Sequence, residues 1–388
     1  MRSPTGGPTL RLPPVTPRDS RYWCSLGILR PVVNLRGPLS RVQATAHPNA
    51  CHRPDDALPF GAMKVPDSVI AWIAASGEPH AVALLGSLGR QVAPAAPVPP
   101  ATADVAADPR VQALLDDLER WPPLPAASGM DQKSALWKLG VLADIGMDRS
   151  DPRIAAVAER IVEASGTDGT FLHGGFAHVR TFDTRGYVCL THVVTGALAQ
   201  FGYGDEPAVR SAARAAVAAV RLDGGWRPSK LLAVGTKGEA EPSCPFGTQN
   251  VLRALVALRA AGVPELDGPI DHAAAYLLDA WARRSEPYRP VGFGIGSTFM
   301  KLAYPFVGYA LLKSLDTLSA IPEVASDRRL GEMLAAVLAK RDADGRLRAE
   351  TISGVWAGWD FGQKKQASPW ITALAYRAAF RIGSQSAS

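Results

Sequence analysis

The feature of this sequence that most constrains the fold is a regular alternation of two kinds of helical segment. Five charged, amphipathic segments each begin near an Asp suited to N-capping, at Asp108, Asp151, Asp205, Asp267 and Asp327. Five more apolar segments lie between and after them, at residues 134–146, 186–202, 244–262, 301–321 and 368–383. Because a helix with an apolar stripe must bury that stripe against a neighbour, the pattern predicts stacked helical hairpins. No window shows the alternation of period two that is typical of strands.

Short glycine-containing turns end three of the charged segments: TDGTF at 167–171, LDGGW at 222–226 and ADGRL at 343–347. Glycine supplies the left-handed conformation that ends a helix, and the aromatic residue or Leu after it can fold back onto the helix end. The last four charged segments start 54, 62 and 60 residues apart, which is longer than the roughly 40–47 residues of HEAT repeats. The sequence therefore predicts an all-α fold closed into an α/α toroid, with an open α-solenoid as the alternative.

Charge and composition separate an N-terminal extension from the rest of the chain. Residues 1–62 are rich in Pro, Arg, Gly and Ser and carry five of the six net positive charges, so we expect a disordered extension there. We expect the toroid domain to span 63–388, with a short helical pair and linker at 66–104 and five hairpins at 105–385. Whether translation starts at Met1 or Met63 is left open.

The same properties exclude several classes of function. Residues 63–388 are nearly neutral, which does not favour a nucleic-acid partner. The uncharged run from Gly186 to Gly204 is too polar for a membrane span, so no transmembrane segment is expected. Only Cys189 and Cys244 lie outside the extension, which favours a reducing, cytoplasmic location over a disulfide framework.

At residues 100–385 the chain resembles the α/α toroids of terpenoid (squalene-type) cyclases and protein prenyltransferase β-subunits. LDGGW and EPSCPFGTQNVLRALVAL, at 241–258, are the motifs that carry the resemblance. It implies a barrel whose hollow takes a hydrophobic isoprenoid chain. The Asp-x-Asp-Asp acid of class II cyclases and the Asp-rich magnesium motif of class I synthases are both missing from the sequence. The zinc pattern of the prenyltransferases is broken as well, because the helix at 301–321 has no His.

A metal site can nevertheless be drawn from residues near two of the apolar segments. Cys189 and His192 are three residues apart on one helix face, Cys244 opens the next apolar segment, and Asp183 lies in the preceding loop. Zinc commonly takes such ligands. The alternative is a buried cysteine beside a hydrogen-bonded histidine, which is common in protein cores.

Candidate ligand-binding residues cluster in the loops that precede the apolar segments. We expect cations to hold an anionic head and aromatic side chains to hold an apolar body. The candidates are Arg185, Tyr187, Trp226, Lys301, Tyr304, Trp356, Trp359, Lys364, Lys365 and Trp370. Packing of the tryptophans against helix ends and solvation of the lysines is the alternative interpretation.

The candidate catalytic acids are Asp183 and Asp360. Apolar walls around a buried carboxyl group would raise its pKa enough for proton donation. The leading hypothesis is thus a prenyltransferase-like or cyclase-like protein, more an enzyme than not, that binds an isoprenoid or other hydrophobic ligand with an anionic head in a central cavity. A non-catalytic helical scaffold for a protein or peptide is the alternative. A carbohydrate-processing barrel is a third, and Asp183 with Asp360 is the carboxylate pair that it would use.

Overall fold

Helices make up every regular element that the computed structural model describes, as the sequence predicts. The described residues are 65–92, 102–121, 131–166, 170–171, 188–227, 242–286 and 298–385. All of them belong to the second of the two units into which the chain divides, residues 56–388. The all-α prediction is therefore confirmed, and among the described helices none combines the length and apolarity needed to cross a bilayer.

The two kinds of helix lie where the sequence pattern puts them. The charged helices are α4 (Pro109–Leu118), α6 (Pro152–Glu163), α8 (Pro207–Ala218), α11 (Asp267–Ala282) and α13 (Arg328–Leu338). The apolar helices are α5 (Ala135–Asp144), α7 (Val188–Leu198), α10 (Pro245–Ala260), α12 (Leu311–Leu318) and α14 (Pro369–Gln385). Before them come α1 (Asp67–Ala74), α2 (Pro79–Val92) and α3 (Thr102–Ala106). Short 3-10 turns lie at Pro322–Val324, Gly354–Trp356 and Asp360–Gly362, and a π-helical turn at Ala199–Tyr203 follows α7.

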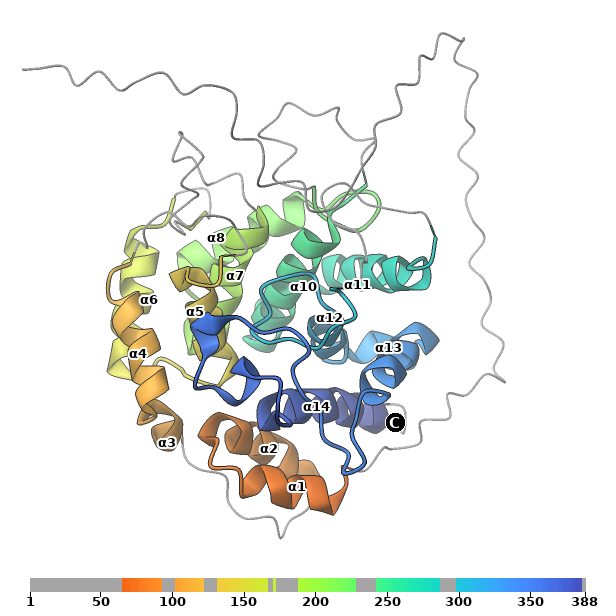
Figure 1. Cartoon of the computed structure of the whole chain (residues 1–388). Helices are drawn as coiled ribbons and strands as arrows, with labels where there is room; N and C mark the ends of the chain where they lie inside the picture. Colours follow the sequence, from red (N-terminus) through yellow and green to blue (C-terminus); the bar gives the residue numbers. More distant parts are fainter. Residues whose placement is uncertain are drawn as a thin grey trace, which may run out of the picture. The chain divides into compact units, whose positions relative to one another are not determined.

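The helices form a closed circuit of contacts, which we call the helical ring (Figure 1). Each apolar helix from α5 to α14 packs against the next one along the chain. The last of them, α14, packs against α1 and α2, and contacts then continue through α3 and α4 back to α5. Contact between the first and last helices is what a toroid requires and an open solenoid lacks, so the toroid prediction holds.

Aspartate capping explains the start of three charged helices. Asp108, Asp151 and Asp327 each accept a hydrogen bond from a backbone N–H in the first turn of α4, α6 and α13. The expected caps at Asp205 and Asp267 are wrong. Glu206 precedes α8, whose first helical residue is a proline, and Asp267 lies inside the first turn of α11, where its charge favours the positive end of the helix.

The LDGGW turn joins the end of α8 to the start of α10. The indole Nε1–H of Trp226 donates to the carbonyl of Ala216 (2.9 Å), so the aromatic residue folds back onto the helix end as expected. The backbone N–H of Trp226 donates to the Thr248 hydroxyl (3.2 Å), and its carbonyl accepts from Cys244 N–H (2.9 Å). These bonds account for three polar groups that would otherwise be buried without partners.

The ADGRL turn docks on α14 in the same way. The N–H of Leu347 donates to the Thr372 hydroxyl (2.9 Å), and its carbonyl accepts from Ser368 N–H (2.7 Å). Thr248 and Thr372 each lie three residues after the proline that opens their helix. Two of the three glycine-containing turns therefore make equivalent hydrogen bonds to the helix that follows them. Residues 167–169 of the third turn lie outside the described part of the chain.

The apolar helix expected at 301–321 is shorter than predicted. Helix α12 begins only at Leu311, and residues 298–310 are turns and extended chain. Pro305 explains the difference, because a proline in a helix interior removes a hydrogen bond and collides with the preceding turn. The non-helical segment places Phe306 beside α10 and α12, where it helps to form the central site.

Glycine substitution tests the LDGGW turn. Gly224 has a φ of 83°, and a Cβ there would lie 2.4 Å from the His272 carbonyl oxygen. Gly262 has a similar φ of 82° but open space around the position of a Cβ. A left-handed residue with a Cβ costs about 1–2 kcal/mol, so Gly262→Ala should lower the free energy of unfolding by about that amount. Gly224→Ala should lose at least about 2 kcal/mol more, because it also collides with α11. Urea unfolding measures both, and equal losses would contradict the contact.

Candidate functional site

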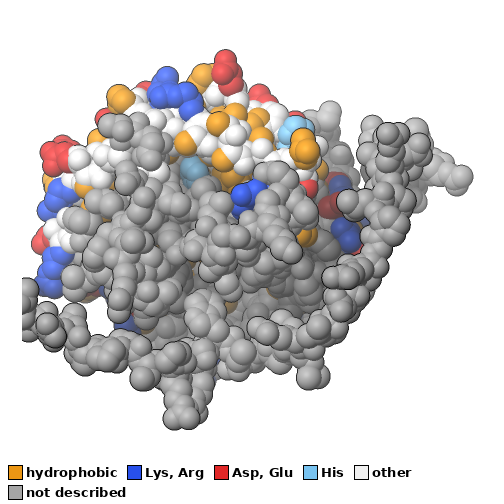
Figure 2. Space-filling model, turned by 90° about the horizontal axis from the view of Figure 1, so that it is seen from above, with side chains coloured by type: hydrophobic (Ala, Val, Ile, Leu, Met, Phe, Trp, Pro, Cys, Tyr) orange, Lys and Arg blue, Asp and Glu red, His pale blue; other side chains and the backbone are white. Residues whose placement is uncertain are grey.

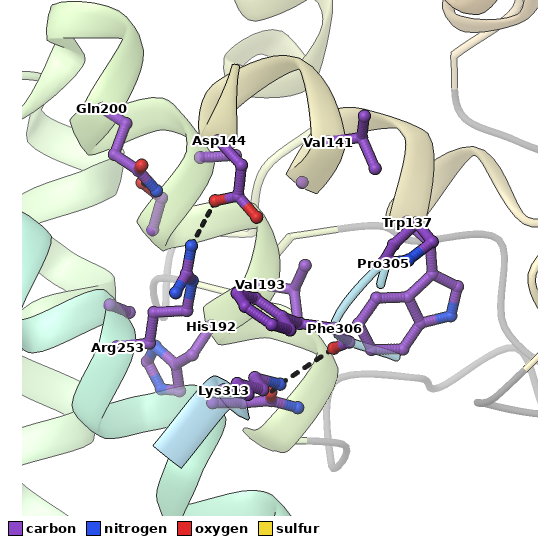
Figure 3. A pocket seen from close by; sticks show the side chains of 15 residues that line it. Trp137, Val141, Asp144, His192, Val193, Gln200, Arg253, Pro305, Phe306 and Lys313 are labelled. Carbon is purple, nitrogen blue, oxygen red and sulfur yellow. Dashed lines mark hydrogen bonds and ion pairs between the residues drawn. The ribbon is translucent and has the colours of Figure 1, made fainter. Parts of the chain in front are cut away.

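The central cavity lies among α5, α7, α10 and the segment from Pro305 to Lys313 (Figure 3). Its volume is about 40 Å³, room for roughly three water molecules. The wall combines apolar and polar side chains and leaves space at small residues of α5, α7 and α10. The lining residues are Trp137, Gly140, Val141, Asp144, His192, Val193, Gly196, Ala197, Gln200, Asn250, Arg253, Ala254, Pro305, Phe306 and Lys313.

Lys313 is the buried cation of this cavity. Its side chain is 2% exposed, and its ammonium group donates to Asn250 Oδ1 and to the Phe306 carbonyl (3.0 Å). The ammonium nitrogen lies 6.0 Å from the centre of the Trp137 indole and 5.7 Å from that of the Phe246 ring. Aromatic faces and carbonyl oxygens stabilise a desolvated cation, so the cavity holds a positive charge next to apolar surface.

Arg253 provides a second cation in the cavity wall. Its guanidinium group pairs with Asp144 and with Asp316 (3.0 Å) and stacks 5.1 Å from the centre of the Phe306 ring. Figure 3 shows its side chain reaching Asp144. Burial lowers the pKa of Arg253, but Asp144 and Asp316 together raise the pKa by more than burial lowers it. The guanidinium group therefore stays charged.

Asp316 anchors this network beneath the cavity. It is 4% exposed and accepts hydrogen bonds from Arg253, from Arg377 (2.7 Å) and from Arg381 (3.4 Å). Burial raises its pKa, but the three guanidinium groups outweigh burial and hold the pKa below its usual value. Burial, followed by repulsion from Arg377, lowers the pKa of Arg381 to about 10. Among the described residues, Lys313, Arg253, Arg377 and Arg381 outnumber the carboxylates Asp144 and Asp316 of this network.

His192 lies on the cavity wall with one nitrogen that has no hydrogen-bond partner. The residue is 4% exposed, and its buried Nδ1 finds no donor or acceptor among the described residues. Burial lowers the pKa of His192 to about 4, so the imidazole is neutral near pH 7. A buried polar atom without a partner is costly, so this nitrogen is a candidate hydrogen-bonding position.

Of the two predicted metal ligands whose side chains are described, His192 borders this cavity and Cys244 does not. Cys244 begins α10, is buried, and its Sγ accepts from the N–H of Gly247 (3.5 Å) as a helix cap. Asp183 and the side chain of Cys189 lie outside the described residues, so the proposed zinc site stays a prediction. Arg185 and Tyr187 lie outside them as well.

The predicted tryptophans pack into the core instead of lining the central cavity. Trp226 caps the end of α8, and Trp356 donates to Gln132 (2.8 Å). Trp359 and Trp370 surround His80, with ring centres 5.3 Å from the imidazole. Tyr304 reaches the cavity indirectly, because its hydroxyl donates to Asp144 (3.1 Å) and burial raises its pKa well above the usual value. The alternative interpretation of the tryptophans, packing against helix ends and loops, therefore fits the structure better.

The predicted lysines are exposed and do not border the central cavity. Lys301 lies in the turn after Phe299, and Lys364 and Lys365 lie in the loop before α14. None of the three lines the cavity wall, whereas Lys313 does. The sequence analysis therefore expected the cations in loops, but the cation at the cavity lies in the apolar helix α12.

Asp360 pairs with a residue from the other end of the described chain. Its Oδ1 lies 3.1 Å from His80 Nε2, and its Oδ2 accepts from Ser368 (2.6 Å) and from Trp370 N–H (2.8 Å). Burial raises the pKa of Asp360, but the bond to His80 and the other two donors lower it below its usual value. The expectation of a raised pKa is therefore wrong for Asp360, and a proton-donating role for it loses its basis. Its hypothetical carbohydrate-site partner, Asp183, is not among the described residues.

A signal for the central site was present in the sequence. Arg253, Lys313, Asp316 and Arg377 are charged residues inside otherwise apolar segments, and charged side chains are rarely buried unless they are paired. Because the apolar helices pack against one another, charged residues on them are expected to lie close together. Which of these residues pair with one another cannot be derived from one sequence.

Comparison with known proteins gives only distant similarity. No family model and no curated protein matches the chain. A protein from Actinoplanes is 14% identical with a TM-score of 0.39, over 82% of this chain and 90% of that one. An Arg→Ala variant of the type II terpene cyclase MstE from Scytonema, in complex with geranylgeranyl dihydroxybenzoate, is 13% identical with a TM-score of 0.39, over 85% of this chain and 91% of that one. Apo MstE is 13% identical with a TM-score of 0.37, over 84% and 91%. At these values the similarity carries no conclusion about substrate or reaction.

Replacing Asp316 tests the network beneath the cavity. Asp316→Asn leaves three guanidinium groups without their shared carboxylate, and breaking a buried ion pair in this way costs about 3–5 kcal/mol. Asp205→Asn is the matched control, because Asp205 pairs with Arg210 but its side chain is 87% exposed, and exposed pairs contribute at most about 1 kcal/mol. Chemical unfolding at neutral pH should separate the two variants, and similar losses would show that Asp316 is not central.

The pH dependence of stability tests the burial of His192. An unfolded histidine takes up a proton near pH 6.5, whereas the folded His192 does so only near pH 4. The unfolded state thus binds more protons between these values, so the free energy of unfolding should fall as the pH drops from about 6.5 to about 4, by about 3 kcal/mol from this group. In His192→Gln this part of the fall should vanish, while the difference from wild type stays constant above pH 7. Parallel curves for the two proteins over pH 4–8 would contradict the prediction.

Proposed function

We propose that the chain binds a small organic anion at the centre of the helical ring. The observation that carries the proposal is Lys313, a buried ammonium group on the wall of a cavity that also presents Trp137, Phe306 and Arg253. An anionic head would lie in the positive field of Lys313 and Arg253, and its apolar part would lie against the aromatic side chains. The unpartnered His192 nitrogen supplies one more hydrogen-bonding position.

The size of the cavity supports a head-group site. At about 40 Å³, it is far smaller than the roughly 300–1,000 Å³ of pockets that enclose drug-sized ligands. A carboxylate or phosphate group with a few apolar atoms fits such a space, while a long isoprenoid chain requires the cavity to widen. Prenyl diphosphates of increasing length are accordingly the ligand series that we propose to test, since the sequence resemblance predicts that class.

The scaffold alternative receives little support from the described surface. The large hydrophobic side chains that are exposed there are Leu222 and Ile352, which lie in different turns, so these residues form no apolar groove for a helix or peptide. Figure 2 shows acidic and basic side chains interspersed on the described part of one face, without a patch of single sign. Binding inside the helical ring is therefore the function that we propose.

Lys313→Met provides the test of the central site. Methionine keeps the length and apolar body of the side chain and removes the charge together with the hydrogen bonds to Asn250 and Phe306. The fold should persist with lower stability, while anion binding is lost. Calorimetry with inorganic pyrophosphate, dimethylallyl diphosphate and geranyl diphosphate should show saturable binding to the full chain. The dissociation constant should rise at least tenfold in the variant.

Lys364→Met is the matched control, because Lys364 is exposed in the loop before α14 and should leave binding unchanged. Equal weakening by both substitutions would indicate general charge attraction and would count against a central site. Absence of saturable binding for the whole series would overturn the proposal for diphosphates.

A further inference from the structure

A second buried cluster lies away from the central cavity, where α2 meets the loop before α14. Glu78 and His80 stand at the start of α2, and Asp360 stands in the 3-10 turn Asp360–Gly362. One candidate ligand atom from each of the three lies within 4.8 Å of the others, and no other group of this kind occurs among the described residues. His80 is 1% exposed, and its imidazole packs against Trp359, Phe361 and Trp370.

The hydrogen bond to Asp360 fixes which imidazole nitrogen carries the proton. Asp360 Oδ2 accepts from the Ser368 hydroxyl (2.6 Å) and from Trp370 N–H (2.8 Å), so the carboxylate acts as a hydrogen-bond acceptor. His80 Nε2 must then donate the 3.1 Å bond. In a neutral imidazole this leaves a lone pair on Nδ1, which is the arrangement that a carboxylate imposes on metal-binding histidines.

His80 Nδ1 faces a carboxylate oxygen without bonding to it. Nδ1 and Glu78 Oε2 are 3.7 Å apart, too far for a hydrogen bond, and the buried Nδ1 has no hydrogen-bond partner in the described part of the chain. Two atoms that bind the same zinc ion in a tetrahedral site lie about 3.4 Å apart. The separation therefore suits an ion held between the two atoms better than it suits a proton shared by them.

The charge balance of the cluster also favours a cation. Glu78, through the same Oε2, and Asp108 both pair with Arg110, at 2.8 and 2.5 Å, and Asp360 contributes a third carboxylate. With a neutral His80, one guanidinium group compensates these three carboxylates, and partly buried negative charge is costly until it is neutralised. An open depression of about 480 Å³ lies next to the cluster and shares Arg110 and Asp108 with it; its lining residues are Gly77, Pro79, Asp104, Ala107, Asp108, Pro109 and Arg110.

We propose that His80 Nδ1 and Glu78 Oε2, with Asp360 orienting the imidazole, form a binding site for a divalent transition-metal ion such as Zn²⁺. Water from the adjacent depression completes the coordination. Both ligands lie at the start of α2, and the ion would hold the imidazole in the orientation that donates to Asp360 in the loop before α14. Because the ion would bind only the folded arrangement, its binding stabilises the fold. The site is independent of the anion site and of the zinc ligands predicted from the sequence.

Zinc titration of the full, chelator-stripped chain tests this proposal. Calorimetry should show saturable Zn²⁺ binding, and the melting temperature should rise with Zn²⁺. Glu78→Gln keeps the size of the side chain and removes a ligand charge, so it should weaken binding at least tenfold and remove the thermal shift. His80→Gln should abolish binding at this site, since its amide can still donate to Asp360 but cannot bind zinc well.

The controls separate a built site from general attraction. Asp104→Asn removes an exposed acid from the same depression and should leave both readouts unchanged. If His80→Gln fails to fold by circular dichroism, Glu78→Gln alone decides the matter. Zinc binding and a thermal shift that survive Glu78→Gln belong to other ligands of the chain and overturn the proposal, as does the absence of saturable binding in the wild type.

Discussion

The buried carboxylate of Asp316 is the interaction on which the arrangement of the apolar helices depends. It lies on α12 and binds guanidinium groups from α10 and α14, which would repel one another without it. Apolar side chains pack well in many registers, whereas charge-assisted hydrogen bonds have fixed directions. Arg253 also forms an ion pair with Asp144 on α5. Four of the five apolar helices are thereby held in register, and the cavity lies at the edge of this network.

The two candidate sites differ in the sign of their charge. Around the central cavity, cations outnumber carboxylates, and the most buried of them, Lys313, has aromatic side chains beside it. In the cluster around His80, carboxylates outnumber cations. Both sites place charge where water is scarce, so each favours a ligand of the opposite sign. If both proposals hold, the helical ring would bind an anion at one site and a metal ion at the other without competition between them.

The sequence was informative wherever structure follows from local pattern. Apolar periodicity located both series of helices, and glycine with a following Trp or Leu located two turns that dock on the next helix. The prediction of a helix was wrong for residues 301–310, because Pro305 disrupts a helix despite the apolar pattern. The prediction of which residues line the candidate site was also incomplete. Tryptophans in loops suggested a binding surface but are core residues here, because indole groups near helix ends bury readily. The pairings of His80 with Asp360, or of Lys313 with Asn250, join residues far apart in the chain and leave no local trace.

Closure of the helical ring has a consequence for how the protein is made. The hydrogen bond between His80 and Asp360 spans 280 residues, and α1 and α2 pack against α14 near the end of the chain. On the ribosome, the first two helices appear long before their partner has been synthesised. The apolar faces of α1 and α2 stay without their partner α14, either exposed or bound by a chaperone, while the hairpins from α4 to α13 assemble in order. Helix α14 leaves the ribosome after the other described helices and completes the ring, so removal of a few turns of α14 would expose both ends of the ring at once.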